Sequence, residues 1–424
     1  MFGYILYMGT SKKISILSLS IFVSNLTYAT TNSQSEIEQL RAEVKELRAL
    51  IMQQQLNKHA IEKKVNETAV ITPVPIETAK VDVPKTPLLT TNGAEFKIYG
   101  FARLDGIYDI ETASGEFIDM SAQPLTGAKD KAQLVAATTR LGIDVKKETD
   151  IGTVTAKVEG DFWGRNGTNR GNFRFRQGYV SVNNWLIGQT ASSFISLDTM
   201  PDMIDFNAIV GGSFRRSPQL RYTTAVSDQT KLMVALEESS ANSSIPDLTA
   251  KLEYKTDKGL ANIRGVVSQV RDTTSKEKEL GYGAAVAGVY KFSPSFSTSG
   301  QLIYLNGANK YSDTGSSTYI LDKEQDIALN EMLGAYVAAT YKFNPQWRST
   351  LAYGWSEFDD DNTFSRNVKS DTANKQLQQA AINIIYNPMP NITLGGEYSW
   401  GMRELMSGDD AKLSRFNLMG RYNF

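Results

Sequence analysis

Apolar and polar residues alternate along most of the chain, from residue 96 to residue 424. The first stretch, residues 96–110, places Ile98 and Leu104 on one face and Arg103 and Asp105 on the other. A strand of a water-soluble sheet usually alternates over only about four to eight residues. Alternation over the whole of this longer stretch predicts a tilted membrane-spanning strand, with lipid on its apolar face and water on its polar face.

Further segments repeat this pattern, and together they give sixteen expected strands, an even number as bacterial outer-membrane barrels require. The expected strands are residues 96–110, 138–148, 152–163, 172–182, 185–191, 218–226, 230–238, 248–256, 260–271, 280–292, 295–306, 332–343, 346–357, 376–387, 391–402 and 413–424. Short connections containing Asn or Pro alternate with long polar ones, at residues 111–137, 192–217, 307–331, 358–375 and 403–412. This asymmetry predicts short periplasmic turns and long outer loops.

Aromatic residues lie near the ends of several expected strands, where they predict a girdle at the membrane–water interface. They include Tyr290, Phe292, Phe296, Tyr341, Phe343 and Trp347. The last expected strand turns Phe416, Leu418 and Tyr422 toward lipid and ends on Phe424. The predicted fold class is therefore all-β, a 16-stranded antiparallel transmembrane β-barrel, and an N-terminal periplasmic coiled-coil helix is expected before it.

Residues 1–29 are expected to be a cleaved signal peptide. Two lysines precede an apolar stretch from Ile14 to Leu26, and small residues lead to Ala29. The apolar stretch is shorter than the ~20 residues that a membrane-spanning helix needs. Met8 is an alternative start, and either start leads to export.

Residues 30–69 are expected to form a periplasmic coiled coil. Heptad positions a and d hold Ile37, Leu40, Val44, Leu47 and Ile51. Opposite charges at positions g and e favour parallel self-association, although a single solvated helix is the alternative. Residues 70–95 contain four prolines and are expected to be an extended linker to the barrel domain, residues 96–424.

The connection 192–217 is long and rich in Ile, Phe, Met and Val, which are unfavourable in open water. We expect it to fold into the lumen and narrow it; a trimer contact or a cell-surface loop is the alternative. The candidate channel-lining residues are inward-facing arginines: Arg103, Arg140, Arg174, Arg176, Arg221 and Arg264. Guanidinium groups in a narrow pore favour anions and bind carboxylates by paired hydrogen bonds. The alternative is that inward carboxylates such as Asp105, Glu159 and Asp161 neutralise them.

Composition excludes several other functions. The 424 residues contain no Cys and one His, and their formal net charge is -1. The balanced charge gives no indication of nucleic-acid binding, and the lack of Cys removes thiolate and Cys/His zinc chemistry. The single His, His59, lies outside the barrel, so we predict no catalytic residue, no metal site, no cofactor and no enzymatic activity. A non-conducting adhesin or structural tether remains the alternative to a channel.

Three stretches of the sequence resemble the DcaP-like outer-membrane porins. They are FKIYGFARLDG from residue 96, FRFRQGYVSVNNWLIGQTASSF at 173–194 and SPQLRYT at 217–223. The resemblance covers nearly the whole mature chain. It implies a homotrimeric channel in the outer-membrane lipid of a Gram-negative bacterium, which passes small anionic solutes and particularly dicarboxylates.

The resemblance also implies roles for individual residues. Arg103, Arg174, Arg176 and Arg221 match channel-wall positions, whereas Arg140 and Arg264 rest on strand register alone. The terminal Phe424 resembles the signal that outer-membrane barrel assembly machinery reads.

Overall fold

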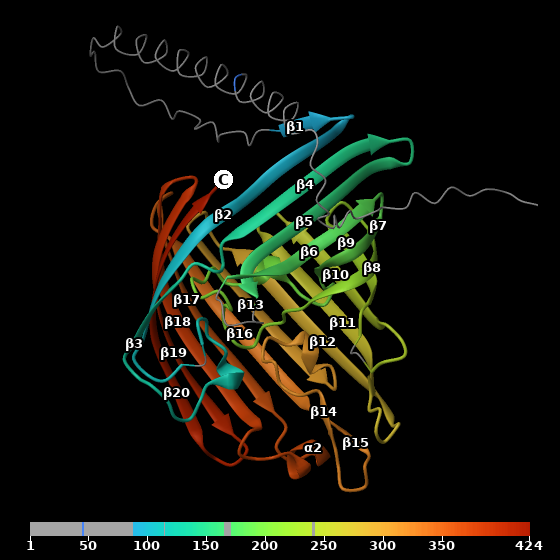
Figure 1. The fold of residues 1–424 in the computed structure, drawn as a ribbon, viewed down its shortest axis with the longest axis vertical. Helices are drawn as coiled ribbons and strands as arrows, with labels where there is room; N and C mark the ends of the chain where they lie inside the picture. The colour runs from blue at the N-terminus through green and yellow to red at the C-terminus, as the bar shows by residue number, and fades with distance from the viewer. Residues whose placement is uncertain (1–44, 46–87, 114, 165–170, 240–241) are drawn as a thin grey trace, which may run out of the picture. The chain divides into compact units, whose positions relative to one another are not determined.

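The alternating segments form one closed antiparallel β-barrel in the computed structural model (Figure 1). The structure describes residues 45, 88–113, 115–164, 171–239 and 242–424. The first barrel strand, β2 (Ala94–Asp109), pairs with the last, β20 (Asp410–Asn423). Among the described residues, closure gives each membrane-spanning strand of the barrel a partner strand on both sides, as a lipid environment requires.

The described residues contain sixteen barrel strands when β3 and β4 are counted as two parts of one strand. They are β2, β3 (Lys131–Val135) with β4 (Arg140–Thr149), β5 (Gly152–Gly164), β6 (Asn172–Val182), β7 (Trp185–Ala191), β8 (Arg216–Ala225), β9 (Thr230–Glu237), β10 (Asp247–Thr256), β11 (Gly259–Arg271), β12 (Lys278–Lys291), β13 (Phe296–Asn306), β16 (Glu331–Lys342), β17 (Trp347–Phe358), β18 (Asn374–Met389), β19 (Ile392–Leu405) and β20. The predicted 16-stranded antiparallel barrel is confirmed. The predicted signal peptide, almost all of the coiled coil and most of the linker lie outside the described residues.

Two short strands of the barrel sheet depart from the predicted boundaries. β1 (Leu88–Thr91) falls in the expected linker and pairs with the start of β2. Asn92 and Gly93 connect them with positive φ values of 48° and 72°, which suit a two-residue hairpin turn. β3 falls in the expected loop 111–137 and pairs with the second half of β2.

The outer connections contain the remaining short elements. β14 (Tyr319–Leu321) and β15 (Ile327–Leu329) form a hairpin inside the connection 307–331. The short helices are η1 (Met120–Ala122), η2 (Leu197–Thr199), η3 (Asn309–Tyr311) and α2 (Thr363–Asn367). No helix among the described residues is long and apolar enough to cross a membrane.

The alternation separates a lipid-facing surface from the lumen. On β2, Leu104 is 50% exposed, whereas its neighbour Asp105 is 0% exposed. The six aromatic residues of the expected girdle are all exposed on the outer surface, where Tyr290 packs on Phe292 and Tyr341 on Phe343. These rings lie at the end of the barrel that carries the short turns, which agrees with an interfacial position.

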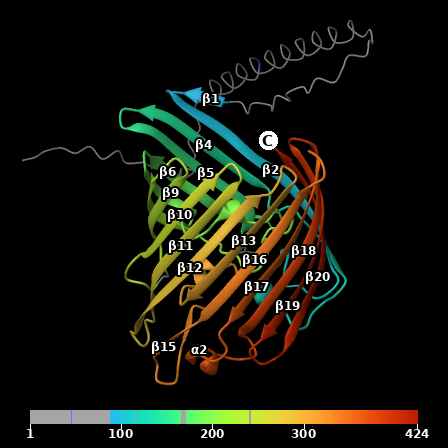
Figure 2. The ribbon, with the colours of Figure 1, turned by 180° about the vertical axis from the view of Figure 1, so that it is seen from behind.

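Three connections fold into the barrel instead of extending away from it. They follow β2, β7 and β13, and their buried side chains include Ile118, Phe194 and Tyr311. The β7–β8 connection lies inside the strand wall in both views of the ribbon (Figures 1 and 2).

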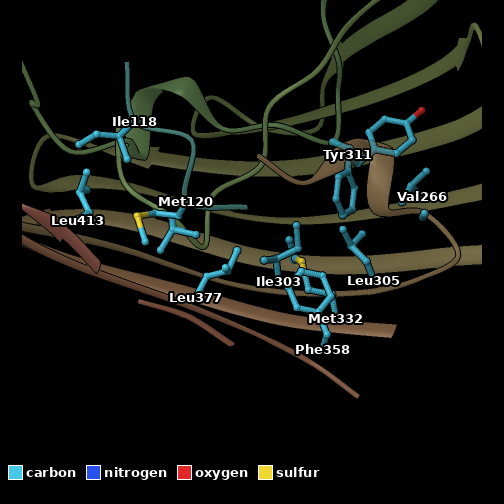
Figure 3. Packing of buried hydrophobic residues seen from close by; sticks show 14 residues of the cluster. Ile118, Met120, Val266, Ile303, Leu305, Tyr311, Met332, Phe358, Leu377 and Leu413 are labelled. Atoms are coloured by element: carbon cyan, nitrogen blue, oxygen red, sulfur yellow. The ribbon is translucent and has the colours of Figure 1, made fainter. Parts of the chain in front are cut away.

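An apolar cluster joins these connections to the far wall of the barrel (Figure 3). Ile118 and Met120 come from the first connection and Tyr311 from the third; Leu377 and Leu413 project from β18 and β20. These side chains are at most 4% exposed, so apolar contacts fill that part of the lumen. A cavity in the lumen lies beside the part of the barrel wall that contains β4, β6 and β8.

Candidate functional site in the barrel lumen

Two buried arginines hold the inward β7–β8 connection by its backbone carbonyls. Arg264 on β11 is 2% exposed and donates to Phe194 O at 2.8 Å. Arg103 on β2 donates to Ile204 O at 2.5 Å and forms an ion pair with Asp105 at 2.7 Å. Hydrogen bonds from charged donors are stronger than neutral ones, so these contacts fix the connection against the strand wall.

A single carboxylate holds the start of this connection. Glu237 at the end of β9 is 1% exposed and accepts hydrogen bonds from Ser192 Oγ at 2.8 Å and from the Ser193 amide at 2.9 Å. It also accepts from Ser217 Oγ on β8 at 3.0 Å and from Thr249 Oγ1 on β10 at 2.6 Å. Strands β8, β9 and β10 are thereby joined to the first residues of the connection.

Glycine permits the connection to lie directly on the barrel wall. A Cβ at Gly211, where φ is +89°, would overlap the carbonyl of Ala335 on β16. A Cβ at Gly354 on β17 would overlap the carbonyl of Val210. Both positions therefore require glycine for the close approach, and larger residues would force the connection away from the wall.

The first connection is tied to the same framework. Arg415 on β20 is 1% exposed at its side chain and donates to Glu116 O at 3.1 Å and Gly115 O at 2.6 Å. Asn207 of the β7–β8 connection donates to Ile118 O at 2.8 Å, and Asp205 accepts from the Ile118 amide at 3.2 Å. The two connections thus support each other inside the lumen.

A cavity of about 480 Å³ remains between the connections and the barrel wall. Four guanidinium groups line its wall side, on β4, β6 and β8, and they belong to Arg140, Arg174, Arg176 and Arg216. The connections supply Phe206 and Phe214 together with the carboxylates of Asp119 and Asp313. The cavity therefore carries opposite charges on its two sides.

Two carboxylates on β5 partly neutralise the arginine wall. Asp161 is 0% exposed and accepts from Arg174 Nη2 at 2.7 Å and from Arg176 Nη1 at 2.6 Å. Glu159 lies 3.2 Å from Arg176 Nε and 3.6 Å from Arg140 Nη1. Four guanidinium groups face two carboxylates, which leaves an excess of two positive charges on this wall.

Aromatic rings support the guanidinium groups. The Arg174 guanidinium lies 4.7 Å from the Trp163 ring centroid and 5.6 Å from the Phe206 ring centroid. Phe206 also lies 5.4 Å from the Arg176 guanidinium. Phe117 packs edge-on against Trp163 at 5.2 Å, so the same aromatic group connects the arginine wall to the connections that follow β2 and β7.

The six arginines expected from the sequence occupy different places. Arg140, Arg174 and Arg176 line the cavity together. Arg103 and Arg264 bind the backbone of the β7–β8 connection, and Arg221 lies on β8 outside the cavity lining. Arg216 lines the cavity but was not predicted, because it lies inside the expected connection 192–217 and before the expected strand 218–226. Its position near the end of that apolar connection is the signal that the sequence offers.

Two carboxyl groups of the inward connections are perturbed by burial. Burial raises the pKa of Asp313 to about 7, and the nearby Asp119 acts in the same direction. Burial likewise raises the pKa of Asp205 to about 7, against the opposing effect of Arg415 at 3.7 Å. Within the part of the chain that the structure describes, no cluster of three or more metal-binding side chains occurs.

A family model described as DcaP outer membrane protein matches residues 27–424. The chain belongs to the DcaP family. This DcaP-family chain is similar to the outer membrane channel DcaP of Acinetobacter baumannii, with 36% identity, 79% of this chain and 99% of that chain covered, and a TM-score of 0.75. No curated protein matches the chain.

More distant structures share the fold of this DcaP-family chain. An anion-selective porin from Comamonas acidovorans is 12% identical, with a TM-score of 0.54 and coverage of 78% and 100%. A trimer form of OmpT from Vibrio cholerae is 12% identical, with a TM-score of 0.53 and the same coverage. The family membership identifies the chain as an outer-membrane channel of the porin type and not an enzyme.

Proposed function

We propose that this channel lets small anionic solutes, particularly dicarboxylates, diffuse passively across the outer membrane. The observation that carries the proposal is the cavity wall with Arg140, Arg174, Arg176 and Arg216. Its two excess positive charges face a cavity narrowed by the β7–β8 connection. A narrow space between protein walls strengthens charge interactions, so an anion is favoured at this wall.

A dicarboxylate suits this wall better than a monovalent anion. Arg174 and Arg176 are two residues apart on β6 and therefore project from the same face of the strand. Each guanidinium offers a planar fork of donors that matches one carboxylate. Two carboxylates of one solute can engage two guanidinium groups at once, although Asp161 competes for both.

We further propose that the channel is a homotrimer in outer-membrane lipid. The trimer form of OmpT, which shares this fold, supports this assembly. Phe424 and Tyr422 at the end of β20 are both exposed on the lipid-facing side, which is consistent with recognition by the barrel assembly machinery during insertion. The periplasmic coiled coil expected at residues 30–69 would add to the association of the three subunits.

Block of potassium chloride current by succinate in planar bilayers tests the proposal. Arg174→Ala with Arg176→Ala should weaken the block about tenfold, since one hydrogen bond to a charged group contributes at least about 1.5 kcal/mol. Arg366→Ala is the matched control, because Arg366 is exposed on an outer connection and pairs with Asp361. Unchanged block in the double variant would contradict binding of dicarboxylates at this wall.

A further inference from the structure

The cavity has an acidic side as well as a basic one. Asp119 immediately precedes η1 in the first inward connection, and Asp313 follows η3 in the connection after β13. Both line the same cavity as the arginine wall. The two carboxylates belong to different connections, and the packing of those connections on the barrel interior brings them to one side.

Only one of the two carboxylate oxygens of Asp313 has a hydrogen-bond partner among the described residues. Its Oδ2 accepts from the Gly212 amide at 3.0 Å. Its Oδ1 is buried and has no hydrogen-bond partner among the described residues. An unsatisfied buried carboxylate oxygen is unfavourable, so a donor in the cavity would stabilise it.

We propose that the cavity recognises small solutes that carry an ammonium group together with a carboxylate, such as small amino acids. The carboxylate binds the arginine wall and the ammonium binds Asp313, which makes Asp313 a specificity-determining residue. The volume of about 480 Å³ lies within the usual range for small-molecule sites. The carboxylate half of this inference rests on the proposed function; the ammonium half rests on Asp313.

Protonation of Asp313 controls the ammonium half of the site. The charged groups around it are Asp119 from the first connection and the four arginines across the cavity, and Tyr336 projects from β16. With a pKa of about 7, the charged fraction of Asp313 falls roughly tenfold between pH 8 and pH 6. Affinity for an ammonium group must therefore decrease as the pH falls through this range.

Flux of radiolabelled alanine and lactate into liposomes containing the full-length channel tests the proposal. The two solutes have similar size, but lactate has a hydroxyl where alanine has its ammonium. Asp313→Asn should lower the alanine-to-lactate flux ratio about fivefold, the upper end for an ion pair that water still reaches. Asp409→Asn, on an exposed outer connection, is the matched control and should keep the ratio.

A pH series on the unaltered channel tests the same claim without a substitution. The flux ratio should fall between pH 8 and pH 6, and Asp313→Asn should remove this dependence. A ratio that is unaffected by both the substitution and the pH would overturn the inference. If the unaltered channel shows normal anion preference in potassium chloride, such a result leaves the proposed function intact; lack of anion preference would overturn the proposed function itself.

Discussion

Glu237→Ala should release the start of the β7–β8 connection from the barrel wall. The carboxylate accepts from Ser192 Oγ at 2.8 Å and from the Ser193 amide at 2.9 Å, and it is 1% exposed. Alanine leaves these buried donors without their acceptor. The connection then loses its first attachment, whereas the bonds from Arg264 to Phe194 O and from Asn262 to Ser196 Oγ remain.

The magnitude follows from the two lost hydrogen bonds. Each bond to a charged acceptor contributes about 1.5 kcal/mol, so the docked position loses about 3 kcal/mol if the effects add. Since about 1.4 kcal/mol corresponds to a factor of ten, the ratio of released to docked connections should rise roughly a hundredfold. A released connection widens the pore, and the arginine wall then lies opposite open water.

Single-channel recording in planar bilayers measures this change. Glu237→Ala should give larger conductance steps and more open-channel noise than the unaltered protein. Thr249→Val is the matched control: Thr249 donates to the same carboxylate at 2.6 Å but belongs to β10 and not to the connection. If conductance and noise in Glu237→Ala equal those of the unaltered protein and of Thr249→Val, this carboxylate does not hold the connection.

Three further predictions concern pH, assembly and processing. Asp205 has a raised pKa of about 7 in the docked connection, so its carboxyl binds a proton more tightly there than in the released connection. Docking therefore weakens as the pH rises from about 4 to 7. Open-channel noise should be greater at pH 8 than at pH 5. Asp205→Asn should abolish this dependence, and equal noise at both pH values in the unaltered channel would contradict it. Deleting residues 30–92 should leave a trimer with lower heat resistance on gels, because a short heptad run assists association without dominating it. A purely monomeric product would show that the coiled coil is the main cause of association. N-terminal sequencing of outer-membrane material should begin at or near Thr30, and an uncleaved start would disprove the signal peptide.

The strand pattern could be predicted because lipid imposes it on every strand. Leu104 must face lipid and Asp105 must face the lumen, so a single period of two runs through the whole barrel. Local departures carry no such signal. The chain between β3 and β4 leaves the sheet for only a few residues, and the hairpin β14–β15 lies in an outer connection where membrane depth places no restriction on its side chains.

The candidate site was only partly predictable, because strand parity gives the side on which a residue lies but not its height or its partners. Arg174 and Arg264 are both inward-facing, yet Arg174 lines the cavity and Arg264 is covered by the β7–β8 connection. The apolar residues of that connection did indicate that it folds inward, since Ile204 is 0% exposed. Contacts between distant segments decide which arginines the β7–β8 connection covers. The position of Asp313 in the cavity also depends on such contacts.

The reversal potential in a potassium chloride gradient tests the central claim most directly. At about 0.1 M salt the screening length is roughly 10 Å, so the two excess charges of the arginine wall act across the cavity. The unaltered channel should reverse toward the chloride equilibrium potential. Arg174→Ala with Arg176→Ala leaves two guanidinium groups against two carboxylates, and its reversal potential should move toward that of potassium, by less at about 1 M salt. Cation preference in the unaltered channel, or the same reversal potential in both proteins at low salt, would contradict an arginine wall that selects anions.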